Sequence, residues 1–142
     1  MPKRILPLLL LLIISLILLS CDQEPEPEME ELKSTSIEGA TLEIGKDIDE
    51  ERFILEPSTT FKANEDIYFR YHNNRPFGED RVIVQLIDSS NENVLGEHDY
   101  TEQLDQEDLY FTDRVYFGAP GRFMIAVSVA GEIRASRELM ID

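Results

Sequence analysis

The stretch that most decides the fold is Phe123-Met124-Ile125-Ala126-Val127-Ser128-Val129-Ala130-Gly131-Glu132. Its large apolar residues alternate with smaller or more polar ones, so one face of an extended chain carries Phe123, Ile125, Val127 and Val129. Gly131-Glu132 then turns the chain into a second run that ends at Ile141. This pattern predicts a β-hairpin with one buried face.

Shorter runs of the same kind recur upstream, separated by turn-forming residues at Asn73–Gly78 and Asp88–Asn93. No window longer than a few residues repeats its apolar residues with a helical period, although the polar segment Thr101–Asp108 has room for a helical turn. The predicted strand regions are Thr41–Ile44, Phe53–Leu55, Ile67–His72, Arg81–Ile87, Val94–His98 and Leu109–Phe117, followed by the hairpin. The sequence therefore predicts an all-β domain of about seven short strands, arranged as a two-layer sandwich.

The residues that open the hairpin carry a resemblance to a known architecture. Ala119-Pro120-Gly121-Arg122-Phe123 resembles the corner before the penultimate strand of immunoglobulin-like and fibronectin-III-like domains. A tyrosine is common at that corner and its hydroxyl bonds back to the chain, whereas Phe123 keeps only the packing role. The resemblance implies an immunoglobulin-like antiparallel β-sandwich, a scaffold used mainly for binding.

The only cysteine, Cys21, lies at a sharp change of composition. Lys3 and Arg4 precede an almost unbroken apolar stretch, Ile5–Leu19, and the acidic run Asp22–Glu28 follows the cysteine. A basic start, an apolar middle and a small residue before a cleavage site are the parts of a secretory signal peptide. The sequence therefore predicts export from the cytoplasm.

Leu18-Leu19-Ser20-Cys21 resembles the lipobox of bacterial lipoproteins. The resemblance implies cleavage between Ser20 and Cys21, a diacylglycerol on the thiol, and acyl chains such as palmitate that hold the protein on a membrane. Two readings compete with this one. A spanning anchor is disfavoured because the apolar stretch makes a helix of only about 22 Å against a core of ~30 Å. A plain secretory signal would leave a lone free thiol outside the cytoplasm.

The chain divides into three predicted parts: a signal peptide at 1–20, the lipidated cysteine with an acidic Pro/Glu tether at 21–36, and a β-sandwich domain at 37–142. The tether has too few apolar residues to offset the entropy of ordering it. Asp22, directly after the cysteine, resembles a signal that retains lipoproteins on the inner membrane in some bacteria. The expected location is therefore the cell envelope, with the domain facing the periplasm or the exterior.

The charge of the chain excludes one class of partner. Its 29 acidic and 13 basic residues give −16, and removal of Lys3 and Arg4 with the signal moves this to −18 (11 − 29). Such a surface repels nucleic acids and anionic headgroups. The domain should stand away from the bilayer, and we expect no nucleic-acid partner.

Candidate binding residues lie near one predicted turn. Arg70, Arg75 and Arg81 together have the charge to hold an acidic ligand, or they neutralise neighbouring acids. Phe77 lies in a loop, where its ring either forms part of a binding patch or fills the end of the sandwich. The tyrosines expected on outward faces are Tyr68, Tyr100, Tyr110 and Tyr116.

Catalytic and metal-binding patterns are weak. His72 and His98 are the only histidines, and the chain has no Gly-x-Ser-x-Gly or His-Glu-x-x-His motif and no phosphate loop. Three acidic stretches contain carboxylates that calcium could use as ligands, but none has the spacing of an EF-hand. These stretches are Asp47–Glu51, Gly78–Asp80 and Asp88–Asn93. We therefore expect no catalytic residues, cofactor or metal.

These observations favour a non-enzymatic, membrane-anchored lipoprotein that binds an envelope or surface protein. The alternative is a binding module for a small ligand or for calcium, acting as an accessory subunit of a transporter or sensor.

Overall fold

The computed structural model describes residues 31–142, whose folded unit extends from Leu32 to Asp142. The predictions for the signal peptide and for Ser20, Cys21 and Asp22 lie outside the described residues. Within the described part, no helix combines the length and apolar character needed to cross a membrane.

The described residues are almost entirely strands and connecting turns, as the alternating pattern predicts. The elements are β1 (Ser34–Ser36), β2 (Thr41–Gly45), β3 (Thr60–Phe61), β4 (Ile67–His72), β5 (Val82–Asp88), β6 (Asn93–Asp99), the 3₁₀ turn η1 (Thr101–Gln103), β7 (Tyr110–Val115), β8 (Gly121–Val129) and β9 (Glu132–Ile141).

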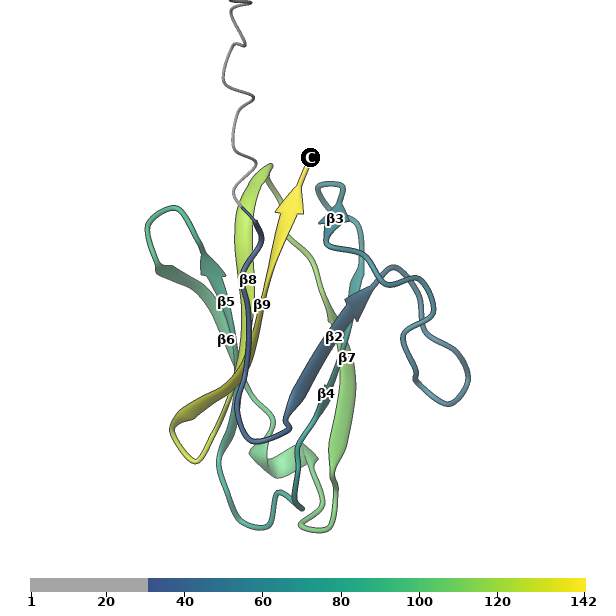
Figure 1. Cartoon of the computed structure of the whole chain (residues 1–142), viewed down its shortest axis with the longest axis vertical. Coiled ribbons are helices and arrows are strands. Elements are labelled where there is room, and N and C mark those ends of the chain that lie inside the picture. Colours follow the sequence, from purple (N-terminus) through teal and green to yellow (C-terminus); the bar gives the residue numbers. More distant parts are fainter. Residues whose placement is uncertain (1–30) are drawn as a thin grey trace, which may run out of the picture. The chain divides into compact units, whose positions relative to one another are not determined.

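The strands form two sheets that face each other as the layers of a sandwich (Figure 1). The larger sheet has the order β1-β9-β8-β5-β6, and β3 adds to β9 in a parallel pairing. The smaller sheet has the order β2-β4-β7, with both pairings antiparallel. The predicted all-β sandwich is confirmed.

The strand order also has the immunoglobulin-like arrangement. Immunoglobulin domains place their strands B and E in one sheet and C, F and G in the other. In this chain β4 and β7 are neighbours in the smaller sheet, and β5, β8 and β9 are successive neighbours in the larger one. The predicted hairpin, β8 with β9, corresponds to the last two strands of that fold.

Two details differ from the sequence prediction. Strand β1 begins at Ser34, inside the segment that the sequence assigns to the tether, and β3 has only two residues, so neither shows an alternating pattern. The run Phe53–Leu55 forms an isolated bridge, Ile48 with Ile54, in place of a strand. Its flanking side chains, Phe53 and Leu55, are about half exposed.

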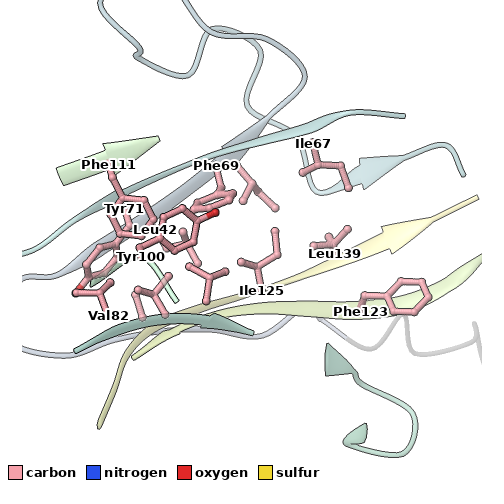
Figure 2. Packing of buried hydrophobic residues seen from close by; sticks show 14 of the residues in the cluster. Leu42, Ile67, Phe69, Tyr71, Val82, Tyr100, Phe111, Phe123, Ile125 and Leu139 are labelled. Carbon is pink, nitrogen blue, oxygen red and sulfur yellow. The ribbon is translucent and has the colours of Figure 1, made fainter. Parts of the chain in front are cut away.

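The core lies between the two sheets, where alternate side chains of the strands meet (Figure 2). Ile125, Val127 and Val129 of β8 are buried as predicted, and Phe123 stacks on Phe117 with ring centroids 4.4 Å apart. Phe123 therefore has a packing role at this corner. Figure 2 shows the rings of Phe69, Tyr71, Tyr100 and Phe111 grouped toward the other end of the core.

Candidate binding surface

Phe77 lies in the core and is only 2% exposed. Its ring lies 6.1 Å from that of Tyr71 and 6.0 Å from that of Phe111, centroid to centroid. Of the two interpretations of Phe77, the binding patch is therefore wrong and the position at the end of the sandwich is confirmed. The ring fills the end of the sandwich, because an apolar side chain of this size gains more from burial than from exposure.

Arg70 is buried on the outer face of the smaller sheet. Its guanidinium lies 4.1 Å from the ring of Phe53 on one side and 4.1 Å from that of Tyr110 on the other. Its Nη1 also donates a hydrogen bond of 3.0 Å to the carbonyl of Arg52. Cation–π contact and this hydrogen bond fasten the loop 46–58 to β4 and β7. Arg70 therefore has a structural role, because its guanidinium holds this loop against the sheet.

Arg75 and Arg81 each pair with a different acid. Arg75 Nη2 lies 3.4 Å from Asp80 Oδ2, and Arg81 Nε lies 2.9 Å from Asp99 Oδ2. Hydrogen bonds from the hydroxyl and main chain of Thr101, together with Arg81, lower the pKa of Asp99 to about 2. The three arginines engage separate partners, so they form no common site for an acidic ligand.

Tyr100 is buried, contrary to the prediction of an outward face, whereas Tyr110 and Tyr116 are 45% and 63% exposed. The Tyr100 hydroxyl donates a hydrogen bond of 2.6 Å to Asp113 Oδ2 on β7. Burial, this hydrogen bond and the charge of Asp113 raise the pKa of Tyr100 strongly. Tyr100 directly follows β6, the edge strand of the larger sheet. The bond therefore links the segment after β6 to β7, the edge strand of the smaller sheet.

In two of the three acidic stretches that contain carboxylates suited to calcium, an aspartate caps its own turn, and in the third, Gly78–Asp80, Asp80 pairs with Arg75. Asp88 Oδ1 accepts bonds from the main chain and hydroxyl of Ser90, which lower the pKa of Asp88. Asp49 accepts from the main-chain N–H of Phe53. Within residues 31–142, no three acidic, histidine or cysteine side chains are grouped so that they could hold a metal ion.

The two histidines lie in different sheets, His72 on β4 and His98 on β6. His98 Nε2 is 2.9 Å from Gln103 Nε2, and its ring centroid is 4.4 Å from that of Tyr100. The histidines therefore do not form a joint catalytic pair.

A groove opens on the side of the sandwich where β6 and β7 are the edge strands of the two sheets. It has a volume of about 460 Å³. We call it the lateral groove; its lining residues are Leu86, Leu95, Arg114, Val115, Tyr116, Phe117 and Gly118. Most of this lining is apolar, and Leu95 and Tyr116 are 56% and 63% exposed. Exposed apolar side chains around a groove are typical of an interaction site.

A second hollow, of about 360 Å³, lies beside Tyr110 and η1. Its lining includes Tyr100 and Asp113, whose polar groups already bond to each other. The lining of the lateral groove is more apolar than that of this hollow. Among the described residues, no two lining residues of the lateral groove are joined by a side-chain hydrogen bond. The sequence did not reveal it, since Leu95 and Tyr116 come from different sheets and no periodicity relates them.

Comparisons with known proteins assign no family. No protein-family model matches the chain, and no curated protein matches it. Among solved structures, the chain is similar to the PmoD soluble domain from Methylocystis sp. (Rockwell), with 11% sequence identity and a TM-score of 0.42. That match covers 72% of this chain and 90% of the solved one.

Proposed function

We propose that this chain is a membrane-anchored, extracytoplasmic lipoprotein whose β-sandwich binds another envelope or surface protein without catalysing a reaction. The binding role depends on the lateral groove, where apolar side chains of β6 and of the segment after β7 remain exposed around one hollow. Anchoring depends on the sequence around Cys21, which resembles a lipobox.

The spacing between the proposed anchor and the domain suits this role. Twelve residues, 22–33, separate Cys21 from the start of β1 at Ser34. A fully extended chain of that length spans at most about 45 Å. The acidic residues within this segment and the acidic domain repel anionic headgroups, so the groove remains accessible to a partner.

Membrane fractionation and radiolabelled palmitate test the anchoring part. The wild-type protein should carry the label and partition into the detergent phase, whereas Cys21→Ser should do neither. Ser20→Ala is the matched control, because a small residue still precedes the cysteine, and it should behave like the wild type. Membrane retention of Cys21→Ser without label would contradict lipid anchoring.

Cross-linking in cells tests the binding part. A photoreactive amino acid at position 95 or 116 should give a recurrent cross-link to one identified envelope protein. Position 133 is the control, because Ile133 is 45% exposed but does not line the lateral groove. Equal cross-linking at positions 95 and 133 would contradict the groove as the binding surface.

A further inference from the structure

We infer that the free edge of β6 binds an extended, basic segment of the partner protein, one of whose apolar side chains enters the lateral groove. This inference rests on the proposed function and adds the chemistry of the partner. It follows from four properties of β6: its unpaired edge, a glycine with free space above it, the apolar residues beside it, and its charge.

Strand β6 ends the larger sheet and, among the described strands, pairs only with β5. It has seven residues, of which all but Gly96 are exposed. Natural edge strands are usually protected by charged residues, above all lysine, by proline, by a bulge or by a covering segment, because their free N–H and C=O groups can pair with another chain. β6 contains neither lysine nor proline; its charged residues, Glu97 and Asp99, are acidic and admit a basic strand, and beyond the bulge at Leu95 its register is regular from Gly96 to Asp99. Its main chain is therefore suited to the addition of a strand.

Gly96 leaves space on the side of β6 that faces the groove. It pairs with Leu86, and paired residues project to the same face, so the missing side chain of Gly96 points toward the groove that Leu86 lines. A Cβ at Gly96 would meet only Leu86 Cδ1, at 3.9 Å. The backbone of Gly96 has no positive φ that would require glycine. A glycine within a strand often marks a place where another chain approaches closely.

The residues next to Gly96 supply apolar contacts. Val94 and Leu95 are 51% and 56% exposed, and a register shift opposite Leu86 and Ile87 places Leu95 as the extra residue of a bulge. Tyr116, just after β7, also lines the groove. A strand added to β6 would extend the larger sheet along the mouth of the groove, and its inward side chains would face Val115 and Phe117.

The negative charge of the domain and of β6 indicates which kind of partner segment can bind. Residues 31–142 contain 24 acidic and 11 basic side chains, a formal charge of −13 (11 − 24). On β6 itself Glu97 and Asp99 are exposed, Asp99 being paired with Arg81, and Glu92 directly precedes the strand. Arg114, the basic residue that lines the groove, is paired with Asp66. A second copy would bring the same charge to this edge and be repelled. A segment with lysine or arginine beside its apolar residues complements the edge, so the partner is a different protein.

Selection from a library of short random peptides displayed on phage, with the full-length protein in detergent micelles as bait, tests this inference. The enriched peptides should alternate apolar and other residues, carry lysine or arginine, and lack proline at their centre. A synthetic peptide of the enriched sequence should bind less tightly as salt is raised. It should also slow hydrogen exchange of β6 amides that exchange rapidly in the free protein.

Two variants and one control locate the site. Gly96→Val fills the free space and Leu95→Glu removes an apolar contact, and each should weaken peptide binding about tenfold or more. Ile133→Glu is the control and should leave the affinity unchanged. Thermal denaturation of Gly96→Val should show no loss of stability, so weaker binding by this variant would not reflect unfolding.

Three results would overturn the inference: no enrichment by the wild type over Gly96→Val, enrichment of acidic peptides, or protection of amides outside β6 only. In each case the proposed function would remain if the cross-linking at positions 95 and 116 succeeded. Failure of that cross-linking and of Cys21 labelling would instead refute the proposed function.

Discussion

Arg122 and Glu138 form a largely buried ion pair on the outer face of the larger sheet. Arg122 Nη2 lies 2.8 Å from Glu138 Oε2, and the Glu138 side chain is only 5% exposed. The main-chain N–H of Lys33 donates to the same oxygen, also at 2.8 Å. One carboxylate therefore joins β8, β9 and the residue that precedes β1.

Glu138→Gln should destabilise the domain, because it removes the charge from this shared acceptor. Breaking a buried, hydrogen-bonded ion pair costs about 2 kcal/mol or more in the free energy of unfolding. Urea denaturation at pH 7 measures this change. Glu107→Gln is a matched control at an exposed position and should change the free energy by less than about 0.5 kcal/mol. Equal stabilities of the two variants would contradict a structural role for the pair.

The contribution of Glu138 should depend on pH. Burial raises the pKa of its carboxyl, but the hydrogen bonds from Lys33 and Arg122 outweigh burial, and the pKa lies below the ordinary 4.5. A lowered pKa in the folded state means that the stabilisation is complete above pH 4.5 and is lost as the pH falls through the folded-state pKa. The stability difference between the wild type and Glu138→Gln should therefore shrink as the pH falls below 4.5. A difference that stays constant to pH 3 would contradict this assignment.

Two of the five tyrosines should lose their protons only at a pH well above the ordinary tyrosine pKa. Burial raises the pKa of Tyr71 to about 12, and burial together with Asp113 raises that of Tyr100 further. Because the folded state retains these protons, stability should fall as the pH rises above 10, the ordinary tyrosine pKa. Absorbance at the phenolate band should show a late phase in the folded protein, which Tyr100→Phe reduces. In denaturant all five should titrate together, and a late phase that persists there would contradict the effect of burial.

Arg70→Lys should loosen the loop 46–58. Lysine has no planar guanidinium to lie between the rings of Phe53 and Tyr110, and this cation–π contact is worth about 0.5–2 kcal/mol. Cleavage by a glutamate-specific protease at Glu50, Glu51 and Glu56 should accelerate several-fold, while the domain stays folded. Arg137→Lys is the control, since Arg137 bonds to Ser34 away from this loop. Equal cleavage of the two variants would contradict the role of Arg70.

The sequence predicted those parts of the fold in which one strand face is buried and the other is not. Ile67, Phe69 and Tyr71 are fully buried, as their alternation predicts, and so are Ile125 and Val127 of the β8–β9 hairpin. On β9 the outer face is also buried, at Ser136 and Glu138, which the alternation does not predict. Strands β1 and β3 could not be predicted, because two or three residues are too few to show an alternation of apolar and polar side chains.

At the candidate site, the sequence predictions differ from the structure mainly for polar residues whose partners are distant in the sequence. Tyr100 is buried, and its hydroxyl donates a hydrogen bond to Asp113 on β7, which is distant in the sequence. The sequence leaves Arg70 either to hold an acidic ligand or to neutralise neighbouring acids, whereas the rings of Phe53 and Tyr110 cover it. The lateral groove depends in the same way on which strands end each sheet. Such partners are set by the topology and leave no local pattern in the sequence.

Gly45 and Gly96 should respond in opposite ways to replacement by alanine, although both lie in strands. A Cβ at Gly45 would collide with Ile54 Cγ2 and lie 2.6 Å from the carbonyl oxygen of Glu56, so the segment 54–56 would have to move. Overpacking of this kind costs about 1–3 kcal/mol. A Cβ at Gly96 meets only ordinary contact at 3.9 Å, and the loss of glycine stiffens the unfolded chain, so Gly96→Ala should stabilise by about 0.4–1 kcal/mol.

Thermal and urea denaturation of the two alanine variants measure these opposite changes. A destabilised Gly96→Ala would mean that no free space exists above this residue, and the strand-addition site on β6 would lose its structural basis. A neutral Gly45→Ala would mean that the loop 46–58 shifts at no cost. Opposite signs would establish that Gly45 is glycine because the protein's own loop approaches it. They would also leave Gly96 as a glycine that no contact within the domain requires, as expected where a partner strand fills the space.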